Sequence, residues 1–237
     1  SRVLHHYTKR STVLPLSIQR RALGVLGPPP DDRHASFERV DAGGVPGAWI
    51  RPSDADPSRV LYYLRGGGYS VGSIESHRHF VTRLARKAGA RALLIDYRLA
   101  PEHRFPAQLD DACAAWRWLL RQGVDPRRAV IAGESAGGGL TMSTLITLRD
   151  AGEPLPAAAA VISPWVDLTL SGAAIDENAR FDYLSRHVLR TYVDRVAGDV
   201  DPAHPLLSPI FADLHGLPPM LSQVGAAEGL LDDARTL

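Results

Sequence analysis

The feature that most constrains the fold of this chain is the stretch AVIAGESAGGGL, residues 129–140. An apolar run typical of a strand passes directly into a segment of helical character, and Ser135 stands at the change of direction. A turn this tight accepts only very small residues two positions before and two positions after the serine, where Gly133 and Gly137 stand. We therefore predict a strand, a sharp bend that raises the serine hydroxyl above the edge of a sheet, and a helix that begins at once.

Short apolar runs recur along the chain and alternate with segments of helical periodicity. The predicted strands are residues 59–64, 92–97, 129–133, 157–163 and 220–225, and the predicted helices cover about 76–88, 107–122 and 136–150. This alternation predicts an α/β fold with a mostly parallel central sheet that helices cover on both faces. Two strand patterns around a glycine-rich turn in residues 37–52 add an antiparallel hairpin at one side.

Composition and charge narrow the class of function. A chain of 237 residues with 45% hydrophobic and 22% charged residues is typical of a soluble globular protein. Its formal net charge of +1 does not favour nucleic acid or an anionic membrane as a partner. No run is long enough to insert into a membrane and the first residues lack a signal-peptide pattern, so we expect a cytoplasmic location. Cys113 is the only cysteine, which excludes a disulfide within the chain and a cysteine-based metal site, and we expect a buried thiol.

A second glycine-rich segment, YYLRGGGYSVGS at residues 62–73, follows another apolar strand. Consecutive glycines allow backbone N–H groups to point into a cavity without obstruction by a Cβ atom. We predict that Gly66, Gly67 and Gly68, together with Ala136 at the start of the helix after Ser135, donate hydrogen bonds to an oxyanion.

With these motifs the chain resembles the α/β-hydrolase superfamily, specifically the bacterial hormone-sensitive-lipase-like (family IV) esterases, over about residues 36–237. Further matching strings are DYRLAPEHRFPA (96–107), GESAGG (133–138), SPWVDLT (163–169), LSPIFADLHGLPP (207–219) and QVGAAEGLLDDA (223–234).

The resemblance implies a division of the chain into core and cap. Helices in residues 1–35 and an insertion at 167–215 would form the cap, and residues 36–166 and 216–237 would form the hydrolase core. It also implies hydrolysis of short- to medium-chain carboxylic esters through an acyl-serine, with a small-molecule ester as partner and with no metal or organic cofactor.

Two positions near the expected site depart from the family pattern. Arg65 stands where the family has a histidine that organises the glycine loop, and a bulkier, permanently charged side chain is expected to alter the loop and the pocket. Many relatives carry Asp-Glu where this chain has Ala227-Glu228, so Glu228 is the predicted triad acid. Asp232 and Asp233 are the alternatives, and all three acids could instead simply begin a helix, where the helix dipole favours them.

The third departure concerns the base. The family order is serine, acid, histidine, but every histidine of this chain precedes Glu228: His5, His6, His34, His77, His79, His103, His187, His204 and His215. The pattern reaches Leu237 inside a predicted helix without a stop signal. We therefore expect the family's C-terminal strand and helix, and the triad histidine, to be missing and activity to be impaired. The unpaired strand at 220–225 leaves room for a homodimer.

Two other functions remain open. Plant gibberellin receptors resemble the same family but lack a working base and bind a ligand without catalysis. The same serine could also serve an acyltransferase or an amidase.

Overall fold

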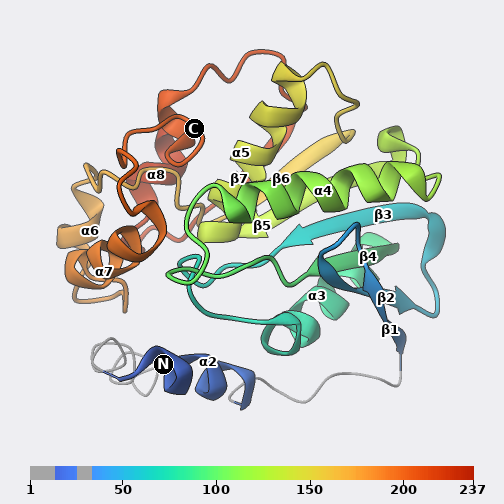
Figure 1. The fold of residues 1–237 in the computed structure, drawn as a ribbon, viewed down its shortest axis with the longest axis horizontal. Helices are drawn as coiled ribbons and strands as arrows, with labels where there is room; N and C mark the ends of the chain where they lie inside the picture. Colours follow the sequence, from blue (N-terminus) through green and yellow to red (C-terminus); the bar gives the residue numbers. More distant parts are fainter. Residues whose placement is uncertain (1–13, 26–33) are drawn as a thin grey trace.

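Seven strands form one sheet in the order β1-β2-β4-β3-β5-β6-β7 in the computed structural model, which describes residues 14–25 and 34–237 (Figure 1). The strands are β1 (Ala35–Asp41), β2 (Pro46–Pro52), β3 (Asp56–Leu64), β4 (Ala90–Ile95), β5 (Ala129–Glu134), β6 (Ala158–Ile162) and β7 (Met220–Gln223). Strand β2 pairs antiparallel with both β1 and β4, and all other pairs are parallel. The predicted α/β fold with its parallel core and leading hairpin is confirmed.

Helices cover both faces of this sheet. Helix α3 (Ile74–Ala88) packs behind it, and α4 (Ala107–Arg121) and α5 (Ala136–Asp150) lie in front (Figure 1). Successive side chains of β3 alternate between the two layers, because a strand points them to opposite faces. Leu61 and Tyr63 join the core beneath α3, whereas Tyr62 and Leu64 join the core beneath α4 and α5. Cys113 is buried in α4, as predicted, and burial raises the pKa of its thiol to about 11.

Local signals in the sequence set the ends of α3. The hydroxyl of Ser73 accepts a hydrogen bond from the backbone of Ser76, and the Ser76 hydroxyl in turn accepts one from the backbone of Ser73. Gly89 ends the helix in the left-handed conformation at φ 58°, which glycine adopts without steric cost. The helix therefore begins directly after the glycine-rich segment and holds its far end in place.

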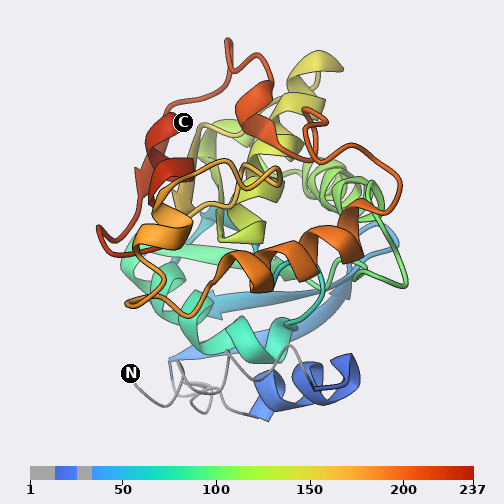
Figure 2. The ribbon, with the colours of Figure 1, turned by 90° about the vertical axis from the view of Figure 1, so that its left-hand side faces the viewer.

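Within the described residues, three helices lie beyond the carboxyl ends of the parallel strands (Figure 2): α2 (Leu16–Val25), α6 (Ala174–Glu177) and α7 (Arg186–Ala197). Figure 2 shows α7 crossing this edge of the sheet. From α2, the Arg20 guanidinium donates to the carbonyls of Ser70 at 2.8 Å and Ala100 at 2.9 Å and pairs with Glu102. Much of the predicted N-terminal cap, residues 1–13 and 26–33, lies outside the described residues.

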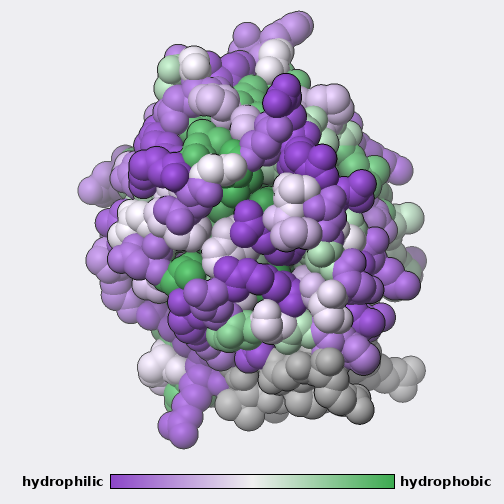
Figure 3. Space-filling model, turned by 90° about the vertical axis from the view of Figure 1, so that its right-hand side faces the viewer, coloured by the Kyte–Doolittle hydropathy of each residue, from purple (hydrophilic) through white to green (hydrophobic). Residues whose placement is uncertain are grey.

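The other end of the sheet is open. Strand β7 is an edge strand whose Leu221 is 65% exposed, and pairing of two chains there stays a prediction. The described residues also form the short elements η1 (Pro126–Arg128), η2 (Pro209–Phe211) and α8 (Leu231–Thr236). Figure 3 shows the face of the molecule at the amino ends of the parallel strands. This face is largely hydrophilic, with small apolar patches. Among the described helices, none has the length and apolar character that crossing a bilayer requires.

The junction of β5 and α5 is closed by contacts that leave no room for side chains. A Cβ atom on Gly133 would lie 2.3 Å from the carbonyl oxygen of Gly137. A Cβ atom on Gly137 would lie 2.0 Å from the carbonyl oxygen of Leu64, the last residue of β3. The two glycines on either side of Ser135 are therefore required by the approach of three backbone segments, as the sequence pattern predicts.

We expect Gly137→Ala to lower the free energy of unfolding by about 3 kcal/mol or more, because the added methyl group would force β3 and α5 apart. The matched control is Gly152→Ala: Gly152 has φ 67° but an open surrounding, so only the backbone conformation costs energy, about 1 kcal/mol. Urea unfolding followed by circular dichroism measures both. Equal losses in the two variants would contradict the close approach.

Candidate active site

Ser135 occupies the bend between β5 and α5 in a conformation that residues other than glycine seldom adopt, with φ 53° and ψ −124°. Such a conformation costs about 1–3 kcal/mol and persists only where the surroundings enforce it. The Ser135 N–H donates to the Ile162 carbonyl at 3.0 Å, and the Ser135 carbonyl accepts from Gly138 and Trp165, each at 2.9 Å. The half-buried serine thus stands at the N-terminus of α5, which starts at Ala136.

The glycine-rich segment after β3 lies directly against this bend. A Cβ atom on Gly66 would lie 3.2 Å from Ser135 Cβ. A Cβ atom on Gly67, which has φ 115°, would lie 2.1 Å from the Val71 carbonyl oxygen. A Cβ atom on Gly68, which has φ 56°, would lie 2.5 Å from the ring of Tyr192 in α7. The structure therefore brings the two predicted motifs together and leaves no space for larger residues in the glycine segment.

The first peptide of the glycine segment is bound at both ends. The Tyr97 hydroxyl donates to the carbonyl of Arg65 at 2.8 Å. The N–H of Gly66 donates to Glu134 Oε1 at 2.5 Å. Of the four predicted oxyanion donors, Gly66 therefore already has an acceptor.

The next two peptides are bound only through their carbonyls. The Gly66 carbonyl lies 3.4 Å from Arg65 Nη1, and the Gly67 carbonyl accepts from the N–H groups of Ser70 and Val71 at 3.0 Å each. In a trans peptide the N–H points opposite to the C=O, so the N–H groups of Gly67 and Gly68 face away from the inside of this turn. Among the described residues they find no acceptor.

Glu134 is a site residue that the sequence reasoning passed over. Besides the N–H of Gly66, its carboxylate accepts from the Tyr63 hydroxyl and lies 2.8 Å from His77 Nε2. The other ring nitrogen of His77 lies 2.8 Å from the Ser76 hydroxyl, so both nitrogens are engaged away from the bend. The partners of Glu134 lie up to 71 positions away in sequence. The only signal of its structural role in the sequence is therefore the presence of an acidic residue next to the serine.

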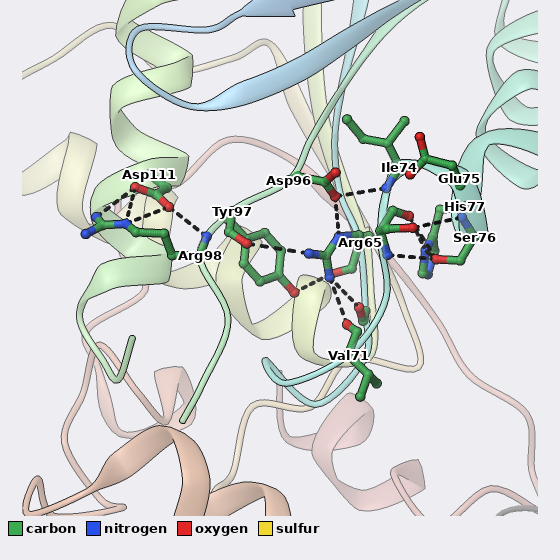
Figure 4. Close-up of polar contacts among 12 residues, drawn as sticks. Arg65, Val71, Ile74, Glu75, Ser76, His77, Asp96, Tyr97, Arg98 and Asp111 are labelled. Carbon is green, nitrogen blue, oxygen red and sulfur yellow. Dashed lines mark hydrogen bonds and ion pairs between the residues drawn. The ribbon is translucent and has the colours of Figure 1, made fainter. Parts of the chain in front are cut away.

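Arg65 is accommodated behind the glycine segment rather than in front of it. The side chain is 1% exposed and lies between the segment and Asp96 and Tyr97, the two residues that follow β4 (Figure 4). With the arginine in this place, Gly66 still abuts Ser135.

Glu228 follows β7 in a turn. Its Oε1 accepts from the N–H of Gly225 at 2.9 Å. The pKa of Tyr183 rises to about 12. The main cause is that protein atoms surround its hydroxyl, although the residue as a whole is 45% exposed. The nearby side chains of Asp182, Tyr192, Glu228 and Glu134 raise this pKa further. Tyr183 therefore lies in the electrostatic reach of both glutamates.

The other two candidate acids bind backbone amides. Asp232 Oδ2 accepts from the N–H of Ala174 at 2.8 Å. Asp233, buried at 3% exposure, accepts from the N–H groups of Val166 and Asp167 at 2.9 Å each. Both carboxylates therefore hold the segment that follows β6, which also contacts the carbonyl of the serine at the bend.

The histidines with described contacts do not bind the Ser135 hydroxyl. His77 contacts Glu134, His204 accepts from the Leu206 N–H, and His215 pairs with Asp213, whereas His5 and His6 lie outside the described residues. Within residues 14–25 and 34–237, no three His, Cys, Asp or Glu side chains gather as a metal site requires.

Comparisons with known proteins relate this geometry to a family. A family model for the alpha/beta hydrolase fold matches residues 61–237. The chain is 46% identical to an acetyl-hydrolase of Streptomyces hygroscopicus, over 99% of this chain and 78% of that protein. It is 33% identical to an esterase of Acinetobacter venetianus, over 87% of this chain and 68% of that protein. The crystal structure of an esterase from the bacterial hormone-sensitive lipase family superposes with a TM-score of 0.92 at 42% identity, over 98% of this chain and 80% of that one.

Asp233 makes the stability of the fold depend on pH. Burial raises its pKa to about 7 from an ordinary value of 3.8, even though its two backbone hydrogen bonds oppose the rise. Between about pH 4 and 7 the folded chain holds a proton that the unfolded chain has lost. The free energy of unfolding therefore falls as pH rises through this window, by at most about 1.4 kcal/mol per pH unit, and this contribution is constant above it.

Asp233→Asn keeps an acceptor for both amides but does not titrate. We expect the difference in unfolding free energy, wild type minus variant, to decrease from pH 4 to pH 7 in urea titrations. The exposed Asp213→Asn serves as the control and should show no such decrease. A difference for Asp233→Asn that does not change with pH would contradict the raised pKa.

Proposed function

The chain belongs to the α/β-hydrolase fold family, among the bacterial hormone-sensitive-lipase-like esterases, and we propose that it hydrolyses short- to medium-chain carboxylic esters through an acyl-serine at Ser135. The observation that carries this proposal is the contact between two backbone features. Ser135 is held at a strained bend, and the glycine segment lies against it; in this segment the N–H groups of Gly67 and Gly68 find no acceptor among the described residues.

The proposed reaction follows from these groups. The Ser135 oxygen attacks the ester carbonyl while an imidazole takes its proton, and the former carbonyl oxygen becomes an oxyanion. We assign its stabilisation to the N–H groups of Gly67, Gly68 and Ala136, each contributing about 3 kcal/mol. This tetrahedral intermediate collapses to an acyl-serine, and the alcohol leaves with the proton that the imidazolium returns. Water then attacks the acyl-serine while the imidazole takes its proton, and the second tetrahedral intermediate releases the acid and the protonated Ser135. Gly66, bound to Glu134, supports the loop in this proposal.

We assign the role of orienting the imidazole to Glu228, because its competitors are committed elsewhere. Asp232 and Asp233 hold backbone amides, and Asp233 is buried in the fold. In the described part of the chain the Glu228 carboxylate accepts one hydrogen bond, from the N–H of Gly225, and keeps acceptor capacity for an imidazole N–H.

The helices beyond the carboxyl ends of the strands form the cap in this proposal. Tyr192 of α7 lies over Gly68, and Arg20 of α2 holds the carbonyl of Ser70 in the same loop. Residues 1–35 and 167–215 would thus enclose the acyl pocket above a core made of the remaining chain.

Within residues 14–25 and 34–237, no hydrogen bond joins the Ser135 hydroxyl to a histidine. All nine histidines precede Glu228, and those with described contacts are engaged elsewhere. We infer that a polypeptide of residues 1–237 alone turns over esters slowly, and the tests below therefore use the full gene product.

Replacement of the nucleophile is the first test. In the full gene product we expect Ser135→Ala to lower kcat for p-nitrophenyl butyrate by about 10³-fold or more, because the acyl acceptor is lost. Ser143→Ala is the matched control on the same helix, because the Ser143 hydroxyl donates to the Gly139 carbonyl of its own helix; this variant should keep wild-type kcat. If Ser135→Ala and wild type turn over at the same rate, the esterase assignment is wrong.

Replacement of the acid is the second test. We expect Glu228→Gln to lower kcat by about 10²-fold or more, because a neutral amide cannot stabilise the imidazolium. Asp232→Asn should lower stability while kcat stays within about 2-fold. The reverse result, a loss of turnover with Asp232→Asn and none with Glu228→Gln, would identify Asp232 in α8 as the triad acid.

Two further measurements separate the other functions. A fluorophosphonate should add to Ser135 in the full gene product, seen as a mass increase of that peptide, whereas a non-catalytic ligand-binding pocket would stay unlabelled. Product analysis with an added alcohol or an amide substrate distinguishes an acyltransferase or amidase from an ester hydrolase.

A further inference from the structure

We propose that Arg65 is a positioning residue for ester hydrolysis, which directs the N–H groups of Gly67 and Gly68 toward the oxyanion and strengthens them as donors. This role rests on the proposed function.

The guanidinium of Arg65 holds one end of the glycine loop to the end of β4. Its Nη1 donates to the Val71 carbonyl at 2.9 Å, and its Nε lies 3.3 Å from Asp96 Oδ1. Its Nη2 lies 3.5 Å from the Tyr97 carbonyl, and its central carbon lies 4.3 Å from the centre of the Tyr97 ring (Figure 4). The Arg65 side chain is 1% exposed, so its own atoms are almost entirely covered by protein.

These contacts fix the direction of the peptides that carry the proposed donors. Arg65 Nη1 lies behind the Gly66 carbonyl, so the N–H of Gly67, in the same planar peptide, points to the opposite side. By holding Val71, Arg65 also fixes the turn in which the N–H groups of Ser70 and Val71 bind the Gly67 carbonyl. That bond in turn directs the N–H of Gly68.

The charge of the guanidinium adds to this geometric effect. A cation at the carbonyl end of a peptide polarises it and makes its N–H a stronger donor. Asp96 compensates the charge only in part, because its Oδ1 also accepts from the N–H of Ile74 at 2.9 Å and its Oδ2 lies 3.9 Å from Arg39 Nη1. The cation therefore lies behind the loop, on the side away from the developing negative charge, where it favours that charge.

Arginine is suited to this place because it reaches several acceptors at once. Its planar group carries five N–H donors, and here it faces three carbonyls and one carboxylate. A lysine would keep the positive charge, but its single ammonium nitrogen would bind fewer of these acceptors than the guanidinium does. A glutamine would still donate hydrogen bonds but would carry no charge.

The test compares Arg65→Gln and Arg65→Lys in the full gene product with p-nitrophenyl butyrate. We expect kcat to fall about 10²-fold in Arg65→Gln and about 10-fold in Arg65→Lys, with KM within about 3-fold of wild type, because the donors act mainly in the transition state. A trifluoromethyl ketone, which adds to the serine hydroxyl and forms an oxyanion, should lose affinity by the same factors as kcat/KM.

The matched control is Arg98→Gln. Arg98 lies on the same segment as Asp96, but its guanidinium binds Asp111 at 2.8 Å and the Ala107 carbonyl at 3.2 Å, both outside the glycine loop. It should lower the melting temperature and leave kcat and ketone affinity unchanged.

Three results would overturn the role of Arg65 while leaving the proposed hydrolase function intact. One is an Arg65→Gln enzyme with kcat and ketone affinity within about 2-fold of wild type. Another is an Arg98→Gln enzyme that loses as much kcat as Arg65→Gln, which would indicate general destabilisation. The third applies if Arg65→Gln does not fold: a kcat of Arg65→Lys equal to that of wild type would then contradict the positioning role of Arg65. A wild-type rate equal to that of Ser135→Ala would instead refute the hydrolase function itself, and the role of Arg65 with it.

Discussion

The approach of the Leu64 carbonyl to Gly137 is the constraint on which the rest of the site depends. It brings the end of β3 to the first turn of α5, where even a methyl group would lie 2.0 Å from the carbonyl oxygen. Because the two segments meet there, the loop after β3 has to pass beside the bend after β5. The strained backbone of Ser135 and the contact of Gly66 with it both follow from this meeting of three chain segments.

Opposite charges hold the glycine loop from its two sides. Glu134 fixes the first peptide through the N–H of Gly66, and the buried guanidinium of Arg65 fixes the carbonyls of Gly66 and Val71. Each charge has its own partners, His77 and Tyr63 on one side and Asp96 on the other. The peptides between them have bound carbonyls, and their amides find no acceptor in the described part of the chain, which is the arrangement that a preorganised anion site requires.

Much of this fold could be predicted because its signals are local. Apolar runs of strand length and segments of helical period gave the parallel sheet, and the small residues around Ser135 gave the bend, since both depend on neighbours within a few positions. The network of Glu134 could not be predicted in the same way. It joins residues 57 to 71 positions apart, and the variable position of a motif carries no sign of what it will contact.

The sequence by itself determined the α/β fold, the bend at Ser135 and a set of three candidate acids near the last strand. Only the tertiary structure decided what surrounds each acid: Asp232 and Asp233 hold amides of a segment about 60 residues away, whereas Glu228 binds within its own turn. It likewise placed Arg65 behind the glycine loop. The reason is physical: backbone preference is set by adjacent residues, but burial and hydrogen bonding of a charged side chain depend on segments that meet only when the chain folds.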